Sequence, residues 1–471
     1  MIKALNTNEN RIPEPVNLAD IDFPSPFYEG LQYNAPARGV WNIVHTGMLI
    51  PESHQVYVCA QGCLRGVILT AAEMNDMERM SWVALRESDM WNGEMEKRVI
   101  EGTAHIVEKI KEDIEKDSTK KMPRCILIYL SCMHMFEGCD FQMITDELSE
   151  MYPGIDFVEC YMIPTMRKTM SPDAMMKLSL YEAVKNQEKQ EDLVALVGSN
   201  LPFDKDSDVC QLINMSGRKI WDIADCKNYE EYLKLGSAPL TISYLSVADA
   251  SCKQMARRLE QKWLRMMINF DEKKLNDNLT MLGKELGIGE DTVNDFIEKS
   301  RSEAYDALAK AHGVIGDAPI AIDYTAFPYI IELAELLTQQ GFNVTSLYSD
   351  GFPVDEKEAY DRLKTIKPEI KVYPTNEPAM RFAAAEKNSS YSASENATAQ
   401  ENPDGQITLA IGQKAAYFTN TSHFVDIVEG GGMYGYSAIK KLADLMIEAY
   451  ENAKDTKKVI SHKGWGCSSC L

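Results

Sequence analysis

Residues 54–66 read His54-Gln-Val-Tyr-Val-Cys59-Ala-Gln-Gly62-Cys63-Leu-Arg-Gly66. An apolar, β-branched run ends in a short glycine-containing turn, and a helical pattern follows over residues 67–79. A strand, a tight turn and a helix in this order are typical of a βαβ unit. Cys59 and Cys63 fall at the carboxyl end of the predicted strand, which is where open α/β sheets usually bind ligands. Two buried thiols in a turn remain the alternative interpretation.

A second stretch repeats this arrangement at residues 125–140, Cys125-Ile-Leu-Ile-Tyr-Leu-Ser-Cys132-Met-His-Met-Phe-Glu-Gly-Cys139-Asp140. The run is almost wholly apolar, which predicts a parallel strand buried on both faces. Such a strand brings Cys132 to the same edge as Cys59 and Cys63, while Cys125 begins the strand and is expected in the core. Cys139 is equally compatible with being a fourth ligand and with having no part in metal binding.

Similar strand patterns recur along the chain and alternate with helical patterns, which favours an α/β fold with parallel sheets. The further strands are expected at residues 155–161, 192–198, 239–245, 318–323, 342–348, 370–373 and 408–412. The longer helices are expected at residues 95–113, 251–269, 293–312, 329–340 and 437–452. We therefore predict three α/β domains, at residues 1–190, 191–315 and 316–471.

Composition excludes several classes of protein. The 471 residues include 49 Lys+Arg against 71 Asp+Glu, a formal net charge of −22, which argues against nucleic-acid binding and against attachment to anionic membranes. No apolar run approaches the roughly 20 residues that span a bilayer. The first ten residues lack the apolar segment of a secretory signal, so we expect a cytoplasmic protein. In that reducing compartment its eleven cysteines are expected as thiols or metal ligands.

Taken together, these segments resemble the component 1 proteins of the nitrogenase family. The resemblance rests on Gly62-Cys63 after a strand, on Ser131-Cys132 with Gly138-Cys139-Asp140, on Val197-Gly198-Ser199-Asn200 at a strand end, and on His423 before Gly430-Gly-Gly-Met-Tyr-Gly435. It implies three Rossmann-like domains with parallel sheets around a central cleft. It also implies an iron–sulfur oxidoreductase.

By the same resemblance, Cys63 and Cys132 are ligands of an interfacial cluster, and Gly62 lets the backbone approach that cluster. The cysteine that the family carries some two dozen residues earlier is missing from residues 36–44. Cys59 is the candidate replacement, so a [4Fe-4S] cluster shared across a dimer interface is a simpler expectation than a full P-cluster. Its fourth ligand could come from Cys139 or from the partner chain.

A second, complex metal cofactor is also implied by the family, although its cysteine ligand has no counterpart here. Tyr244 stands near that place, Cys252 follows it, and His423 matches the segment of the histidine ligand. The candidate catalytic residues are therefore His423, Tyr244 and His54, with His45 as a further candidate in the cleft. A satisfied polar histidine in a loop is the alternative interpretation of His423.

The last motif is Cys467-Ser-Ser-Cys470, which could bind metal, undergo redox chemistry or form an inert tail. The resemblance implies a separate ATP-hydrolysing iron protein as electron donor. It also implies a homodimer, or a heterodimer or heterotetramer with a paralogous chain. Residues 430–432 lack the Lys-Ser/Thr of a P-loop, consistent with ATP being handled by the partner. A scaffold for a metal cluster and a non-catalytic binding protein remain alternative functions.

Overall fold

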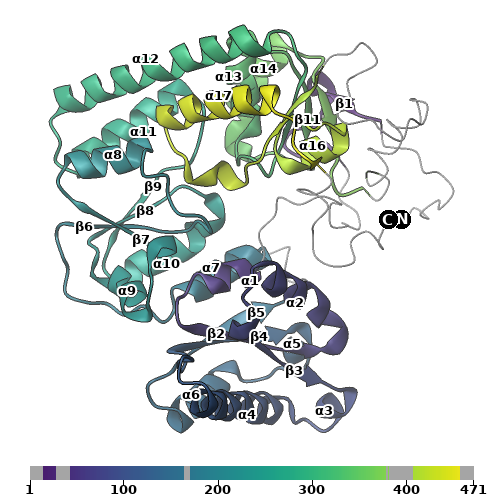
Figure 1. Ribbon diagram of the computed structural model, residues 1–471, viewed down its shortest axis with the longest axis vertical. Helices are drawn as coiled ribbons and strands as arrows, with labels where there is room; N and C mark the ends of the chain where they lie inside the picture. The colour runs from purple at the N-terminus through teal and green to yellow at the C-terminus, as the bar shows by residue number, and fades with distance from the viewer. Residues whose placement is uncertain (1–13, 28–42, 164–169, 378–379, 381–406, 457–471) are drawn as a thin grey trace. The chain divides into compact units, whose positions relative to one another are not determined.

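The computed structural model describes residues 14–27, 43–163, 170–377, 380 and 407–456 (Figure 1). The chain forms two compact units, one made of Met1–Val40, Phe203–Ser216 and Ile268–Leu471, the other of Trp41–Pro202 and Gly217–Met267. Within the described residues, no helix is long and apolar enough to cross a membrane. The described residues form three β-sheets, two in one unit and one in the other.

The first sheet belongs to the second of these units and has the order β3-β2-β4-β5 with all strands parallel. Its strands are β2 (Ser53–Ala60), β3 (Met80–Leu85), β4 (Cys125–Ser131) and β5 (Asp156–Met162). The helices around it are α1 (Ile43–Met48), α2 (Leu64–Glu73), α3 (Glu87–Trp91), α4 (Met95–Lys116), α5 (Cys132–Glu137), α6 (Phe141–Met151) and α7 (Pro172–Leu180). The chain runs from β2 to β3 on one side and then to β4 on the other, so a topological switch point lies between β2 and β4.

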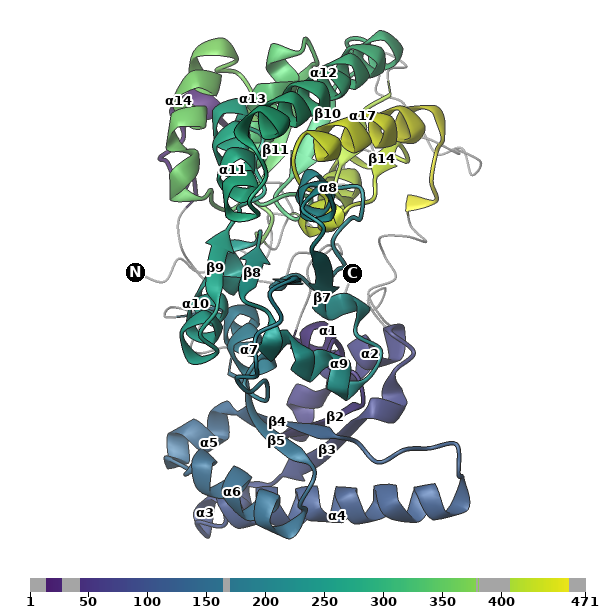
Figure 2. The ribbon, with the colours of Figure 1, turned by 90° about the vertical axis from the view of Figure 1, so that its left-hand side faces the viewer.

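Both faces of this sheet are covered, as its continuous apolar strands require. Val56 and Ile128 point to the face that packs with α4 and α6, whereas Tyr57 and Tyr129 point to the opposite face, where their rings stack 4.2 Å apart. Figures 1 and 2 show α4 and α6 on one side of the sheet and α1 and α2 on the other. The burial of both faces fixes the register, because a one-residue slip would exchange the two faces.

The second sheet lies in the same unit and repeats the topology of the first, with the order β7-β6-β8-β9 and all strands parallel. Its strands are β6 (Leu193–Leu196), β7 (Lys219–Asp222), β8 (Leu240–Ser243) and β9 (Lys262–Arg265), with helices α9 (Tyr229–Leu233) and α10 (Asp249–Arg258). The switch point of this sheet lies between β6 and β8.

The third sheet belongs to the other unit and has the order β1-β12-β11-β10-β13-β14. Its strands are parallel except β1, which pairs antiparallel with β12. The strands are β1 (Val16–Asn17), β10 (Ile320–Asp323), β11 (Val344–Tyr348), β12 (Lys371–Tyr373), β13 (Leu409–Ile411) and β14 (Phe424–Val425). The helices are α8 (Asp208–Met215), α11 (Glu272–Glu285), α12 (Glu290–Ile315), α13 (Ile330–Gln339), α14 (Lys357–Ile366), α16 (Gln413–Thr419) and α17 (Tyr436–Glu451). Helices α12 and α17 pack side by side (Figure 1).

The α/β fold class with Rossmann-like parallel sheets is confirmed, and all nine strands predicted from the sequence are present within a few residues of their expected bounds. One predicted helix is wrong in its second half. The helix expected over residues 251–269 ends at Arg258, and Glu260 adopts a positive φ of 52° that turns the chain. Residues 262–265 then form β9, because Leu264 pairs with Ile242 at the sheet edge. The domain bounds remain a prediction, although β1 and α8 lie in the unit of the third sheet.

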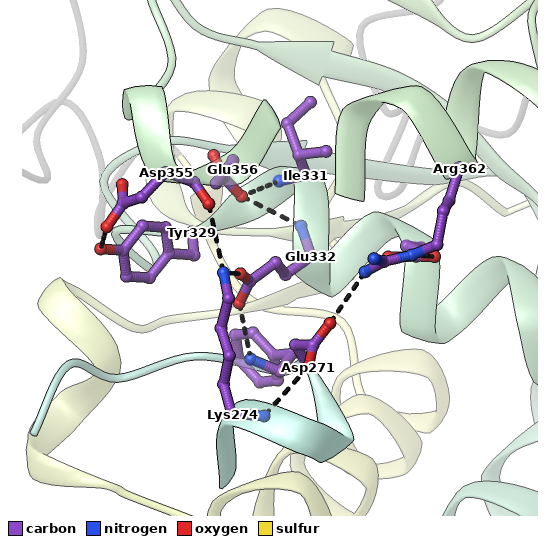
Figure 3. A network of polar contacts seen from close by, with 10 residues as sticks. Asp271, Lys274, Tyr329, Ile331, Glu332, Asp355, Glu356 and Arg362 are labelled. Atoms are coloured by element: carbon purple, nitrogen blue, oxygen red, sulfur yellow. Dashed lines mark hydrogen bonds and ion pairs between the residues drawn. The ribbon is translucent and has the colours of Figure 1, made fainter. Parts of the chain in front are cut away.

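A network of acidic side chains joins three helical segments of the third-sheet unit (Figure 3). Lys274 of α11 donates to the buried Glu332 of α13 over 2.5 Å. Glu356, at the end of the 3-10 helix η8 (Val354–Glu356), is fully buried and accepts from the amides of Ile331 and Glu332, at 2.7 and 3.0 Å. It thereby satisfies two backbone donors at the start of α13. Burial is the main cause that raises the pKa of Glu356 well above the ordinary glutamate value.

Candidate functional site

Three thiols lie at the switch point of the first sheet. Cys59 is the next-to-last residue of β2, and Cys63 ends the 3-10 turn η2 (Gln61–Cys63) that follows. Cys132 is the first residue of α5, directly after β4. Val58 pairs with Leu130 across the two parallel strands, so Cys59 and Cys132 come one and two residues beyond the same rung. The three cysteines therefore lie at the carboxyl ends of two neighbouring strands, as predicted from the sequence.

The three thiols are close enough to affect one another electrostatically. The pKa of Cys59 is raised to about 12, by burial first and then by the neighbouring thiols of Cys63 and Cys132. Cys59 is buried, Cys132 half-buried and Cys63 exposed. Thiolates concentrated at one place repel each other, so their deprotonation together requires a cation or a metal cluster between them.

No three His, Cys, Asp or Glu side chains converge on a point that could hold a single metal ion, within the residues described. An iron–sulfur cluster places a different demand on its ligands, because each thiolate binds a different iron of an extended group. The spread of Cys59, Cys63 and Cys132 around two strand ends therefore fits a cluster better than a mononuclear zinc site, whose four ligands meet at one ion.

The turn between Cys59 and α2 leaves room beside the backbone. A Cβ built at Gly62 or at Gly66 meets no atom within 4 Å. Cys63 is the N-cap of the ten-residue helix α2, whose positive end favours a thiolate or another anion. Open space, a favourable helix dipole and soft thiol donors all suit a bulky anionic iron–sulfur group.

His134 holds the strand–helix junction before Cys132 in a fixed conformation, and the sequence reasoning missed it. The amide of Ser131 donates to His134 Nδ1 over 3.1 Å, and the Ser131 side chain accepts in return from the backbone of His134. This is a capping box with histidine in the place usually taken by Glu or Gln. Its signal in the sequence is Ser-x-x-His at a strand end. Burial lowers the pKa of His134 to about 4, so the ring is neutral with its proton on Nε2.

Cys139 lies on another face of the first sheet. It packs against the apolar cluster on the α4 and α6 side, whereas Cys59 belongs to the cluster on the opposite side. Cys139 is half-buried, and burial first, with the nearby Glu96 carboxylate second, raises the pKa of its thiol to about 12. The structure thus groups Cys59, Cys63 and Cys132, and it has Cys139 beside Glu96.

His54 is the second residue of the strand in which Cys59 is next to last, so five residues of strand, about 17 Å, separate them. Its Nε2 lies 2.8 Å from the Ser81 hydroxyl, and the side chain is buried. Burial first, and the nearby Arg79 second, lower the pKa of His54 to about 4. The structure therefore does not bring His54 to the thiols. His45 lies in α1.

Tyr244 follows β8 at the switch point of the second sheet and is buried, with its hydroxyl donating to Ser199 Oγ over 2.8 Å. Cys252 is a buried residue of α10, and its Sγ is near the backbone of Gly198. Burial is the main cause that raises the pKa of Cys252 to about 11. Tyr244 thus lies just past the carboxyl end of β8, one residue beyond a strand that was expected to include it, and Cys252 lies in the helix that follows.

His423 precedes β14 in the third-sheet unit and is half-buried. Its Nδ1 lies 3.0 Å from the carbonyl oxygen of Ala449. Because a carbonyl only accepts, Nδ1 carries the proton and the lone pair is on Nε2. Histidines that bind metals usually show this arrangement, with the second ring nitrogen donating to a carbonyl or carboxylate. Cys467 and Cys470 lie outside the described residues.

Comparison with known proteins gives consistent results. The family model for nitrogenase component 1 type oxidoreductases matches residues 44–391, well over half of the chain. The solved structure "Nitrogenase Cp1 at pH 6.5" is similar with a TM-score of 0.62 and 13% identity, over 91% of this chain and 95% of that chain. "Nitrogenase Cp1 at pH 5" is similar with a TM-score of 0.55 and 12% identity, over 90% of each chain. No curated protein sequence matches this chain.

Proposed function

Because the chain belongs to the family of nitrogenase component 1 type oxidoreductases, we propose that it is the substrate-reducing subunit of an iron–sulfur oxidoreductase. Low-potential electrons come from a separate ATP-hydrolysing iron protein. An interfacial iron–sulfur cluster receives and passes on these electrons one at a time. The grouping of Cys59, Cys63 and Cys132 at one switch point carries the proposal.

The chain's own residues have distinct tasks in this proposal. Cys63 and Cys132 bind the cluster from the segments that follow β2 and β4, and Cys59 binds it from the carboxyl end of β2 itself. His134 fixes the backbone from which Cys132 projects. Gly62 leaves the space that a cluster with its sulfides requires. A [4Fe-4S] cluster needs one further ligand, and the packing of Cys139 on the face of the sheet opposite to Cys59 favours a ligand from a second subunit.

The surface of α5 supports an interface close to the thiols. Phe136 is 72% exposed and Met135 is 42% exposed, four and three residues after Cys132, respectively. Large apolar side chains that gather at one exposed place are typical of protein–protein contact surfaces. We infer that a second component 1 chain, identical or paralogous, covers this surface and shares the cluster.

The test is anaerobic reconstitution of the full chain with iron and sulfide, followed by measurement of bound iron and of visible absorption. Cys63→Ala and Cys132→Ala should each lose most of the iron and the absorption. Cys226→Ala is the matched control, because Cys226 is half-buried in the second sheet's region, where its thiol lies 3.5 Å from the Asp222 carbonyl oxygen. Retention of all iron in both site variants would rule the proposal out.

A scaffold that holds and transfers a metal cluster is the second candidate. The buried Tyr244, hydrogen bonded to Ser199 where the family's cofactor cysteine is expected, favours it. The two functions differ in one assay. A scaffold transfers iron to an acceptor protein without turnover, whereas an oxidoreductase reduces an added substrate only when the iron protein and ATP are present.

A further inference from the structure

The switch point of the second sheet holds a polar cluster of another kind, in the same compact unit as the thiols. Asn200 lies in the loop that follows β6, Thr46 lies in α1 and Lys177 lies in α7. Helices α1 and α7 pack against each other, as Figures 1 and 2 show. The carboxyl edge of a parallel sheet at its switch point is the usual place for a ligand.

Asn200 Oδ1 is the acceptor on which this cluster converges. Lys177 Nζ donates to it over 2.9 Å, and Thr46 Oγ1 donates to it over 2.9 Å. Lys177 and Thr46 are fully buried, and Asn200 is 8% exposed. A buried ammonium group and a buried hydroxyl therefore share one neutral amide oxygen.

The cluster has more donors than acceptors. Asn200 Nδ2 is buried and has no hydrogen-bond partner among the described residues. Turning the amide around does not help, since Nδ2 would then face the ammonium of Lys177, a donor against a donor. Buried donors without partners are costly and uncommon in folded proteins. The acceptor that would complete this cluster is absent from the described side chains.

Lys177 has no ion-pair partner, since none of the ion pairs within 4.0 Å among the described residues includes it. The one carboxylate that contacts the cluster is that of Asp173, one helical turn before Lys177, and its Oδ1 lies 3.3 Å from Thr46 Oγ1. A buried ammonium group is stabilised by an anion or by several good acceptors around it. An added anionic acceptor would therefore serve both Lys177 and the unpartnered Asn200 Nδ2.

We propose that Lys177, Asn200 and Thr46 bind the carboxylate group of an organic substrate. One carboxylate oxygen takes the place now held by Asn200 Oδ1, between Lys177 Nζ and Thr46 Oγ1. The amide of Asn200 then turns so that Nδ2 donates to the second oxygen. Charge-assisted hydrogen bonds replace neutral ones, which makes the exchange favourable. The inference names the substrate class and so rests on the proposed function, but the binding itself requires no cluster.

The experiment is calorimetric titration of the cluster-free full chain with succinate, a dicarboxylate probe. Lys177→Met and Asn200→Leu should each weaken binding roughly tenfold or more, as expected for the loss of a charge-assisted contact. Lys414→Met is the matched control, because Lys414 is fully buried in the other unit, over the Tyr324 ring. Inorganic phosphate in place of succinate should bind more weakly, since two donor groups match the two oxygens of a carboxylate.

Asn200→Asp gives a second and independent test. This isosteric change supplies a carboxylate from within the chain, so it should abolish succinate binding and raise the melting temperature of the succinate-free protein. No binding of succinate to the unaltered chain would overturn the proposal. So would equal binding to Lys177→Met, or equal binding of phosphate. Cys63→Ala should bind succinate normally, which separates failure of this inference from failure of the proposed function.

Discussion

Two lysine clusters of this protein differ in how the lysine is paired. In the third-sheet unit, Lys274 is 39% exposed and meets the buried carboxylate of Glu332 at 2.5 Å, and Glu356 caps the start of α13 (Figure 3). In the other unit, Lys177 is fully buried and donates to the neutral amide oxygen of Asn200. The first lysine has a carboxylate as its ion-pair partner, whereas the carboxylate at the second cluster, Asp173, contacts Thr46 and forms no ion pair with Lys177 among the described residues.

The difference shows what each cluster contributes. Charges paired within the chain hold α11, α13 and η8 together and need no ligand. A buried lysine without an ion-pair partner costs stability, and proteins retain such residues at sites whose function requires them. Lys177 is the more buried of the two lysines, yet Lys274 is the one that has a carboxylate partner.

The largest expected effect is that of Glu332→Ala. Glu332 is almost fully buried and accepts from Lys274 Nζ and from the Phe270 amide, at 3.0 Å for the latter. Its removal leaves the buried Phe270 amide without an acceptor and takes the ion-pair partner from Lys274, which keeps the Asp355 carbonyl oxygen at 3.2 Å, so the stability of this unit should fall by about 1–3 kcal/mol. Hydrogen exchange of the α13 amides measures the change locally. Adding Lys274→Met to Glu332→Leu should restore part of the loss; an unchanged exchange rate in Glu332→Ala would show that the network is not stabilising.

The second effect has the opposite sign. Lys177→Met removes a buried ammonium that lacks an anion while keeping a side chain of similar size, so the ligand-free protein should gain about 1–2 kcal/mol. Thermal unfolding of the ligand-free chain measures it, with Lys414→Met as the control. Destabilisation by Lys177→Met would make the Lys177 cluster equivalent to the Lys274 network and remove the contrast between them.

The smallest effect concerns pH. Burial raises the pKa of Glu356 in the folded protein above its value in the unfolded chain. Folding therefore favours the protonated acid, and its contribution is present at low pH and is lost as the pH rises through the folded pKa. Glu356→Gln keeps the acceptor for the Ile331 amide without a titrating group. The variant should lose less stability than the unaltered protein between acidic and alkaline pH, as urea unfolding across that range would show.

The sequence predicted the thiol site better than the rest of the candidate residues. Cys59, Cys63 and Cys132 follow apolar runs that could only be buried strands, so their meeting at one edge could be inferred from local pattern. His54 belongs to the same run, but it lies near the amino end of the strand, whereas the thiols lie at the carboxyl end. Cys139 matched a motif, yet its packing against the apolar cluster on the α4 and α6 side of the sheet depends on contacts between distant segments.

By itself, the sequence determined the α/β class, the parallel strands and the placement of three thiols at strand ends, because the spacing of apolar residues and the turns after them are local properties. Only the tertiary structure decided which buried polar groups have hydrogen-bond and ion-pair partners and which lack them. Thr46 is 154 residues before Asn200 along the chain, Lys177 is 23 residues before it, and the three carry no shared motif. Their burial, their shared acceptor and the lack of an ion pair to Lys177 exist only once the two helices and the loop after β6 are packed together, because hydrogen bonding and charge compensation depend on distance in space.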